Sequence, residues 1–459
     1  MVESAGDPSE YQRLQSICKG FFPILDHYLG LTHLASITKQ LPTNAFLSQD
    51  EYFNLHPFHW IAEFPEVLLA RGGFDVIVGN PPYITMKKQT LGQKAIYAAK
   101  YRAFHANGDM YYLFVERSFA LLHPRGTLSY IIPRYFLKAP TAVALKKFLA
   151  SKGVTRIYDF GQSVVFQGVG VHTLMLFAHP SIDSTDSIKV PGVYSKEDFD
   201  AFQGGLLSAE QVSFTPADLQ QENWLFLTPS EQQVFAQINQ DAAGQLDEFC
   251  ILSKGLQTGK DEVFVIDDAT RVTYDIEPGA LRPFLKGSGV QRFSINPPEP
   301  LFLIFSTSHH GDEVMSFPHA AAYLTEHRTE LEDRTRVPAW YQWRLGDERV
   351  TLHWEDPKIV TASRGSENIF ALDRAGYYFS QDVTFIQTLP EFDPYLQYFL
   401  ALLNSTVTRM LMRWQFKELA EDVYEIFPEQ LRKIPVKIPD SETLTRINVI
   451  MQEIENIAP

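Results

Sequence analysis

Short apolar runs alternate with amphipathic helical segments between residues 72 and 180, and this alternation constrains the fold more than any other feature of the chain. The apolar runs contain β-branched residues and stop at turn residues, which is typical of buried strands; they are residues 74–80, 127–133, 155–160 and 171–180. Residues 109–122 and 141–153, which separate the first three runs, have helical spacing. Strands that alternate with helices predict an α/β domain with a mainly parallel sheet.

The remainder of the chain has other patterns. Residues 1–70 have mainly helical and loop character. Residues 181–225 are polar and rich in turn residues, which predicts a domain boundary. Beyond it, short apolar runs are separated by irregular polar stretches and interrupted by helical runs, which predicts an α+β domain. We therefore expect a helical N-terminal segment over 1–70, the α/β domain over 71–200 and the α+β domain over 215–459.

Composition excludes several classes of protein. Of the 459 residues, 45% are hydrophobic and 21% are charged, which is typical of a folded chain. No apolar run is long enough to span a membrane, so we expect no membrane partner, and the first residues lack the features of a signal peptide. The two cysteines, Cys18 and Cys250, exclude a disulfide framework and a Cys-rich zinc site. We expect a cytoplasmic protein with no bound metal.

The strongest local signal is Asn80-Pro81-Pro82-Tyr83 at the end of the first apolar run. A strand that ends in a proline turn is the plain structural interpretation. The position favours a site, because the carboxyl end of a parallel strand faces the crevice in which α/β folds bind ligands. The prolines restrict the backbone, and the Asn80 side-chain oxygen and the Pro81 carbonyl can accept both protons of an exocyclic amine. With the Tyr83 ring beside that amine, these groups suit an extruded base.

This motif and its surroundings resemble a known family. Residues 72–84, GGFDVIVGNPPYI, are similar to motif IV of the gamma-class N6-adenine DNA methyltransferases, and residues 58–84 to the version in fused type IIG restriction-modification enzymes. Residues 109–133 resemble motifs V and VI of that family, and residues 164–177 resemble motif VIII. The C-terminal part resembles the TaqI-like specificity domain; the matching pieces are 255–266, 281–293, 356–365, 402–411 and 431–439.

The resemblance implies a site-specific methyltransferase of a restriction-modification system, which moves a methyl group from S-adenosylmethionine to the N6 amino group of a flipped adenine in double-stranded DNA. Asn80, Pro81, Pro82 and Tyr83 would form the catalytic motif, with Asn80 and Pro81 also beside the cofactor. Tyr83 would stack on the base, and Phe166 would contact its other face. An ordinary core aromatic is the alternative interpretation of Phe166.

The family also has a motif I, an acidic, Gly-rich turn after a strand that holds the cofactor, and no such turn precedes Asn80. We therefore expect an incomplete Rossmann-like methyltransferase sheet with only strands four to seven of the family. Residues 74–80 would then form an unpaired edge. A second polypeptide, a truncation or a broken gene would account for the missing half. A non-catalytic DNA-binding specificity subunit is the main alternative; methylation of RNA adenine or of a protein glutamine fits the TaqI-like part less well.

DNA binding needs cations that contact phosphates. The net charge of −15 argues against attraction by the whole surface, but a local basic cleft is compatible with it. The candidate phosphate contacts lie after the Asn80 motif or in the TaqI-like pieces; they are Lys87, Lys88, Lys254, Lys260, Lys286, Arg292 and Arg364. Solvated surface charges are the plain alternative for most of them. The sequence pattern does not identify the residues that read bases, because readout depends on which side chains reach the groove.

Overall fold

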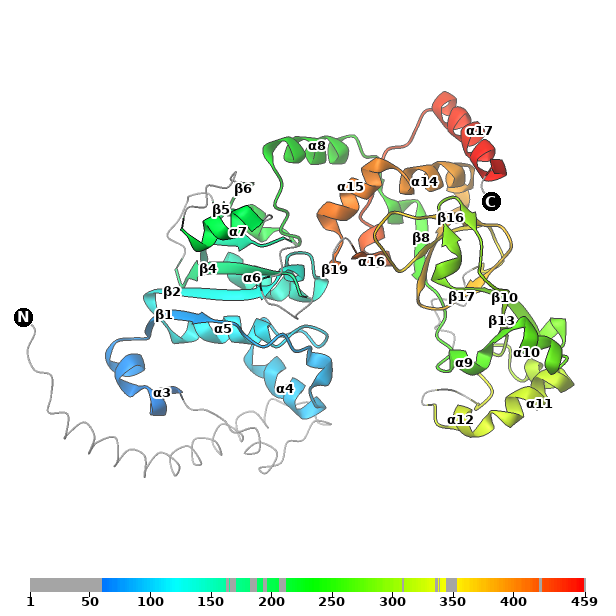
Figure 1. Ribbon diagram of the computed structural model, residues 1–459, viewed down its shortest axis with the longest axis horizontal. Helices are drawn as coiled ribbons and strands as arrows, with labels where there is room; N and C mark the ends of the chain where they lie inside the picture. The colour runs from blue at the N-terminus through cyan, green and yellow to red at the C-terminus, as the bar shows by residue number, and fades with distance from the viewer. Residues whose placement is uncertain are drawn as a thin grey trace, which may run out of the picture. The chain divides into compact units, whose positions relative to one another are not determined.

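The computed structural model describes most of the chain beyond residue 59; the described residues are 60–161, 165, 171–181, 188–192, 196–205, 212–307, 309–334, 337, 339–343, 353–420 and 423–457. The chain divides into two compact units, residues 1–230 and 231–459 (Figure 1). Each unit has its own hydrophobic core. Most of the expected N-terminal helical segment lies outside the described residues, and its last part forms α3 (Trp60–Glu63) and η1 (Glu66–Ala70).

The first unit is built on a six-stranded sheet with the order β1-β2-β4-β3-β5-β6. Its strands are β1 (Phe74–Gly79), β2 (Leu122–Pro133), β3 (Gly153–Asp159), β4 (Thr173–His179), β5 (Ile188–Val190) and β6 (Val212–Phe214). β1 and β2 are parallel, whereas β4 is antiparallel to both of its neighbours, β2 and β3. The expectation of a mainly parallel sheet is therefore wrong. No helical pattern separates the third apolar run from the fourth, and a strand reached without a crossover helix runs antiparallel.

Helices between the strands bury their apolar sides against this sheet. α5 (Tyr111–Leu121) leads from β1 to β2, and α6 (Val143–Ala150) leads from β2 to β3. The other helical elements of the unit are η2 (Met86–Lys88), α4 (Leu91–Lys100), η3 (Arg134–Leu137), η4 (Pro140–Ala142), α7 (Lys196–Gln203) and η5 (Asp218–Gln220). Fully buried side chains from both helices and from the sheet meet in one core; they include Tyr111, Val115, Leu128, Ile132, Leu145, Leu149, Leu174 and Leu176.

The first unit continues beyond the expected end of the α/β domain at residue 200. Lys146, which is 1% exposed, donates from its ammonium group to the carbonyl oxygens of Leu137 and Glu222. The backbone N–H of Trp224 donates to the Leu137 carbonyl at 3.0 Å, and the Trp224 ring is buried in the core of this unit. These long-range contacts attach the segment after β6 to the first sheet. α8 (Pro229–Gln240) follows.

β1 differs from an interior strand because one of its edges has no neighbour among the described residues. Val76 is 61% exposed and Val78 is 73% exposed, whereas Ile77 packs on the core. Phe114 on α5 is also exposed. The apolar composition of the run predicts a buried strand, and the exposure of its two valines departs from that prediction. Parallel strands are ordinarily covered on both faces. Among the described residues, β1 instead has one unpaired edge and one exposed apolar face.

The second unit contains two four-stranded sheets, with the orders β17-β10-β13-β9 and β16-β14-β18-β8, and smaller sheets beside them. The eight strands are β8 (Cys250–Lys254), β9 (Val265–Asp267), β10 (Leu281–Leu285), β13 (Leu301–Ile304), β14 (Lys358–Ala362), β16 (Ala371–Asp373), β17 (Tyr378–Phe379) and β18 (Val383–Thr388). The smaller sheets contain β7 (Gly244–Gln245), β11 (Val290–Gln291), β12 (Ser294–Ile295), β15 (Arg364–Gly365), β19 (Glu418–Ala420), β20 (Val423–Glu425) and β21 (Pro435–Val436). This mixture confirms the expected α+β architecture.

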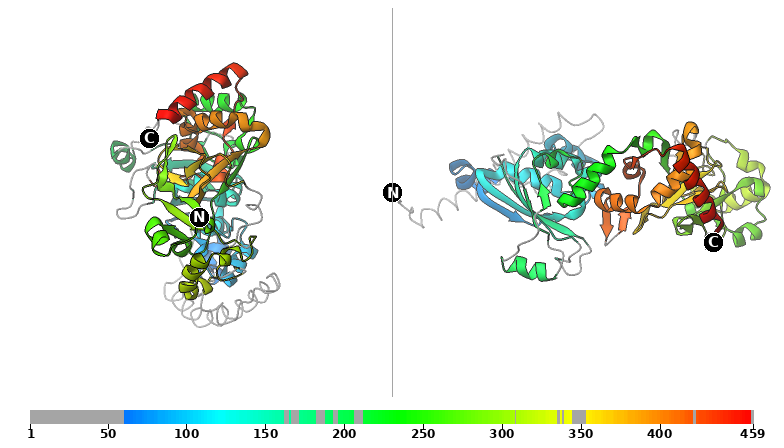
Figure 2. Two further views of the ribbon diagram at one scale, coloured as in Figure 1. Left: turned by 90° about the vertical axis from the view of Figure 1, so that its right-hand side faces the viewer. Right: turned by 90° about the horizontal axis from the view of Figure 1, so that it is seen from above.

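Helices cover parts of this unit; they are α9 (Asp261–Phe264), α10 (Asp268–Thr273), α11 (Pro318–Glu326), α12 (Arg328–Glu332), α14 (Leu396–Leu403), α15 (Thr406–Gln415), α16 (Pro428–Leu431) and α17 (Ser441–Ile457). α17, red in Figure 2, packs against α14, which is orange. A buried ion pair stabilises the second sheet: the Lys358 ammonium lies 2.7 Å from the Asp373 carboxylate, and both side chains are 0% exposed. Burial lowers the pKa of Lys358, and the adjacent Asp373 carboxylate opposes that shift.

Candidate active site and nucleic-acid interface

The Asn80 motif lies where the chain leaves β1, at the carboxyl end of that strand. Gly79 makes this position possible, because a Cβ there would lie 3.0 Å from the ring of Tyr130 on β2. Tyr130 is in turn held by a 2.6 Å hydrogen bond between its hydroxyl and that of Ser118. Asn80 is exposed, whereas Pro81 is buried. The strand therefore presents a polar side chain to solvent on a backbone that the prolines restrict.

Tyr83 is held in one orientation by the neighbouring strand. Its hydroxyl donates to the Ile131 carbonyl of β2 at 3.0 Å. Its ring lies edge-on to the buried ring of Tyr111, with 6.1 Å between centroids. Burial raises the pKa of Tyr83 to about 12, so the phenol stays neutral and keeps donating this hydrogen bond near neutral pH. A half-buried ring with a fixed hydroxyl is suited to stacking against a planar ligand.

The chain after Tyr83 is bonded to the start of α5, a connection that the sequence motifs do not reveal. The Met86 N–H donates to the Gly108 carbonyl, and the Met110 N–H donates to the Ile84 carbonyl, each at 2.8 Å. Asp109, between these two positions, accepts a 2.9 Å hydrogen bond from the hydroxyl of Tyr135. Burial and the Asp109 carboxylate both raise the pKa of Tyr135. This network connects the loop after β1 to the turn after β2.

A buried ion pair lies at the ends of β2 and β3. The Arg134 guanidinium donates to both carboxylate oxygens of Asp159, at 2.8 and 3.2 Å, and Asp159 is 0% exposed. Asp159 also accepts from the Gly161 N–H, and the Arg134 N–H donates to the His172 carbonyl. The pair therefore bonds both sides of the segment 161–172. Phe166, the predicted second contact to a base, lies outside the described residues, so its role stays a prediction.

Two of the predicted phosphate contacts follow the Asn80 motif directly. Lys87 and Lys88 are exposed in η2, where the Thr85 side chain accepts from the Lys87 N–H. Neither ammonium group forms an ion pair with the described residues. Their place on a short, capped turn next to Tyr83 fits the predicted rim of a DNA-binding site, although phosphate contact itself stays a prediction.

The predicted cations of the second unit fall into two groups. Lys286 and Arg364 are exposed and form no ion pair with described residues. The other three already contact neighbouring groups: the Lys254 ammonium lies 3.1 Å from the centroid of the Phe427 ring, Lys260 pairs with Glu330 at 3.5 Å, and Arg292 pairs with Glu367 at 3.1 Å. DNA contact by these three would compete with partners that the chain itself supplies.

Neither a metal-binding cluster nor a membrane-spanning helix is found among the described residues. These residues contain no cluster of three or more His, Cys, Asp or Glu side chains able to hold a metal ion. No helix among them is both long enough and apolar enough to cross a membrane.

Comparison with known families matches both units. Residues 26–166 match the Eco57I restriction-modification methylase family, and residues 282–436 match the TaqI-like C-terminal specificity domain. These matches confirm the restriction-modification methylase and specificity-domain resemblance that the sequence motifs predict. The first match begins well before the described residues, inside the region expected to be a separate helical segment.

Individual relatives agree with the family matches. The type II restriction enzyme and methyltransferase RM.Eco57I of Escherichia coli is 36% identical over 135 residues, which are 28% of this chain and 13% of that protein. The type II methyltransferase M.BanIII of Aneurinibacillus aneurinilyticus is 23% identical over 66% of this chain and 58% of its own length. M.BstVI of Geobacillus stearothermophilus is 24% identical over 81% of this chain and 68% of its own length. The chain thus spans only part of the curated relatives it matches.

A solved structure shares the fold. The type IIL restriction-modification enzyme MmeI, determined in complex with DNA, superposes with a TM-score of 0.58 and 14% sequence identity. The match covers 86% of this chain and 51% of that chain. At this identity the similarity supports the common fold, namely a methylase sheet followed by an α+β domain.

Proposed function

The chain joins an Eco57I-like restriction-modification methylase domain to a TaqI-like specificity domain, and we propose from this premise that it methylates the N6 amino group of an adenine flipped out of duplex DNA. The observation that most supports this proposal is the exposed Asn80 at the carboxyl end of β1. Near it in the chain is Tyr83, whose hydroxyl donates a hydrogen bond to the Ile131 carbonyl. We place this activity in a cytoplasmic restriction-modification system, with S-adenosylmethionine as the methyl donor.

The proposed chemistry divides among the residues of the motif. The Asn80 side-chain oxygen and the Pro81 carbonyl accept the two protons of the adenine amino group, which raises electron density on its nitrogen. Tyr83 stacks on the base, and such stacking contributes about 1–3 kcal/mol. That contribution offsets part of the few kcal/mol that extrusion of a base costs. Because the Tyr83 hydroxyl is already bonded to Ile131, the ring needs no reordering when the base arrives.

S-adenosylmethionine supplies an electrophilic methyl group when it is bound. Asn80 and Pro81 fit a position beside it, because α/β sheets bind cofactors at the carboxyl ends of their strands. We propose that the remaining cofactor contacts come from a further half-sheet, on a second polypeptide or in a longer form of the chain, which adds a strand to the open edge of β1. Two observations support this proposal: no described strand pairs with the outer edge of β1, and Val76 and Val78 are exposed on one face of that strand. Apolar strands of this kind are normally paired at their edges and covered on their faces.

The product of the reaction tests the proposed activity. The chain, alone and with a polypeptide that carries the missing half, is incubated with duplex DNA and labelled S-adenosylmethionine, and the DNA is digested to nucleosides. We expect N6-methyladenine from the combined sample. Label in cytosine would contradict the adenine assignment, and methylation by the chain alone would contradict the proposed half-sheet.

Cofactor affinity tests the same half-sheet independently. We expect the chain alone to bind S-adenosylmethionine with a millimolar Kd and the combined protein to bind it with a micromolar Kd, a difference of about 4 kcal/mol. Calorimetric titration measures both values. Micromolar binding by the chain alone would mean that its own residues complete the cofactor site.

A non-catalytic specificity subunit is the second candidate. The outer edge of β1 favours it, because no described strand pairs with the edge on which the proposed half-sheet would lie. This candidate predicts sequence-preferring DNA binding with no methyl transfer in any combination, so the product assay separates the two functions.

A further inference from the structure

Loops from distant parts of the sequence meet at one place in the second unit. We call them the loop cluster: residues 255–260, 286–289, 363–366, which include the short strand β15, and 380–382. The first three follow the carboxyl ends of β8, β10 and β14, and the last connects β17 to β18. The cluster thus stands at one end of the two four-stranded sheets, on strands whose register is fixed by pairing. Rigid strands that carry polar loops are suited to present side chains to a partner.

Asp382 holds three of these loops together. Its carboxylate accepts from the Gly287 N–H at 3.0 Å and from the Ser380 hydroxyl. Its carbonyl accepts from the Ser363 N–H at 2.6 Å, and the Ser363 hydroxyl donates to the Gln381 carbonyl at 3.1 Å. The Asp382 negative charge is therefore engaged within the cluster.

The glycines of the cluster allow its loops to approach closely. A Cβ at Gly255 would lie 2.1 Å from the Ser380 carbonyl oxygen, and one at Gly287 would lie 3.2 Å from the Asp382 carbonyl oxygen. Gly259 has a φ of +77°, which side chains rarely adopt. These glycines serve the packing of one loop against another, which accounts for their presence without a phosphate contact.

Two glutamine side chains join the first and last loops across the exposed face of the cluster. The Gln381 amide nitrogen donates to the Gln257 amide oxygen at 3.2 Å, and both residues are exposed. This bond leaves the Gln257 nitrogen as a donor and the Gln381 oxygen as an acceptor. In the major groove, adenine presents the complementary pair, the N7 acceptor beside the N6 amino donor.

We propose that Gln257 and Gln381 read an adenine in the major groove of duplex DNA, and that Lys286 and Arg364 contact the phosphates beside it. Both cations belong to the cluster, are exposed and form no ion pair with described residues. The inference rests on the proposed DNA methyltransferase function and extends it from the methylated base to the residues that select the site. A free phosphate ligand is less consistent with the cluster, because the amide pair matches a base edge.

Selection from a pool of randomised duplexes tests this assignment with the full chain. The unsubstituted chain should enrich a site that contains at least one specified A·T pair. Gln257→Ala and Gln381→Ala should each lose about 5- to 150-fold of the discrimination at that pair and retain it at the other positions. Gln240→Ala on α8, an exposed glutamine outside the cluster, is the matched control and should enrich the unchanged site.

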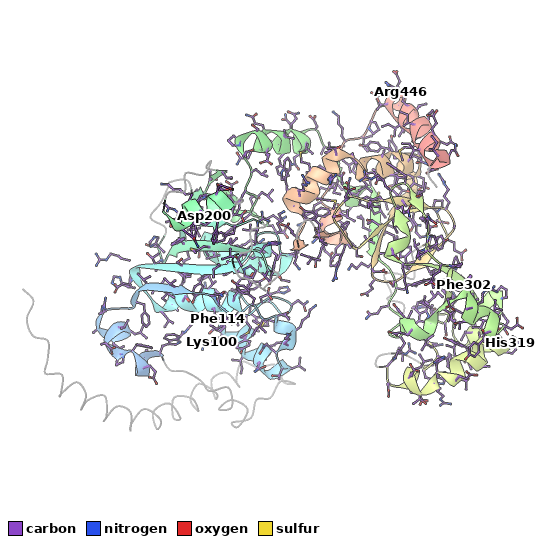
Figure 3. All side chains as sticks on the ribbon, in the orientation of Figure 1. Lys100, Phe114, Asp200, Phe302, His319 and Arg446 are labelled. Atoms are coloured by element: carbon purple, nitrogen blue, oxygen red, sulfur yellow. The ribbon has the colours of Figure 1, made fainter. Side chains whose placement is uncertain are left out.

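A base analogue then identifies the contact. Replacing the specified adenine by 7-deazaadenine removes the N7 acceptor, which should weaken binding of the unsubstituted chain and leave the Gln257→Ala variant unaffected. Lys286→Ala and Arg364→Ala should weaken binding to all duplexes equally and each reduce the salt slope by about one. Arg446→Ala on α17, which packs on α14 (Figure 3), should change neither.

Two results would overturn the proposal, and they are distinguishable. If the unsubstituted chain selects a site and both glutamine variants select the same site with equal stringency, the assignment of the readers is wrong while the proposed function stands. If the unsubstituted chain prefers no duplex over any other, both the readers and the DNA-directed function are wrong. Thermal unfolding of each variant verifies that these exposed substitutions leave the fold intact.

Discussion

The two units differ in how well the rest of each unit pairs and bonds the elements that carry its candidate functional surface. In the first unit, Asn80 follows β1, whose outer edge has no partner among the described strands and whose Val76 and Val78 are exposed. In the second unit, the loop cluster stands on paired strands, and its loops are bonded to one another through Asp382. The proposed catalytic motif therefore lies beside a strand edge that no other described strand pairs with, while the loops of the proposed reading surface are bonded to one another within their own unit. We therefore expect activity to depend on the proposed half-sheet and DNA selection not to depend on it.

The first prediction tests whether the second unit folds and binds DNA without the first unit. We predict that residues 231–459, expressed alone, fold and bind duplex DNA, and that their affinity falls about 10³- to 10⁵-fold between roughly 50 and 200 mM salt. The steep dependence follows if about six to ten phosphate contacts form through a local basic surface. Fluorescence titration against matched and scrambled duplexes measures it. A DNA affinity that does not change with salt concentration, or no DNA binding at any salt concentration, would favour a protein partner for this unit.

Calorimetric unfolding can show whether the two units unfold independently of each other. Asp373→Ala leaves the Lys358 ammonium buried without its counter-ion, which should destabilise the second unit by about 3–5 kcal/mol. The first unit should unfold at an unchanged temperature in the same calorimetric scan. Asp333→Ala, which removes an exposed carboxylate elsewhere in the same unit, is the matched control. An equal shift of both unfolding transitions would show that the units are coupled.

A substitution in the motif should separate chemistry from binding. With the proposed second half present, Asn80→Ala should lower methyl transfer by about 100- to 1,000-fold, because it removes a preorganised group that acts on the reacting amine. DNA affinity should not change, since phosphate contacts and base readout lie elsewhere. Asn239→Ala on α8, whose amide bonds only the Phe235 carbonyl of its own helix among the described residues, is the control. Full activity of the Asn80 variant would refute the catalytic assignment.

Substitution of Tyr83 should lower methyl-transfer efficiency by less than substitution of Asn80. Tyr83→Ala should cost about 1–3 kcal/mol in methyl-transfer efficiency through lost stacking. Tyr83→Phe keeps the ring but removes the hydrogen bond to Ile131, so its cost should be only about 1 kcal/mol. Fluorescence of 2-aminopurine at the target position reports base extrusion in both variants. Equal losses in the two variants would mean that the hydroxyl, and not the ring, carries the role of Tyr83.

The first unit could be predicted well from its sequence because its decisive features are local. The apolar runs became β1 to β4, and Asn80 follows the first of them within one continuous segment. The mainly parallel sheet was wrong, since the position of β4 between β2 and β3 depends on pairing between distant strands. The hydrogen bond between Tyr135 and Asp109 could not be predicted for the same reason, because the two residues are 26 positions apart and meet only in the folded chain.

Local sequence patterns are enough to predict an α/β part, in which Asn-Pro-Pro-Tyr follows a strand, and an α+β part after it. Periodicity and turn residues encode such elements over a few neighbouring positions. The partners of individual side chains become visible in the folded chain alone. Lys254 lies over Phe427, Arg292 pairs with Glu367, and Gln257 meets Gln381 at a separation of 124 residues. Packing between distant segments selects these partners, and no local pattern records that selection.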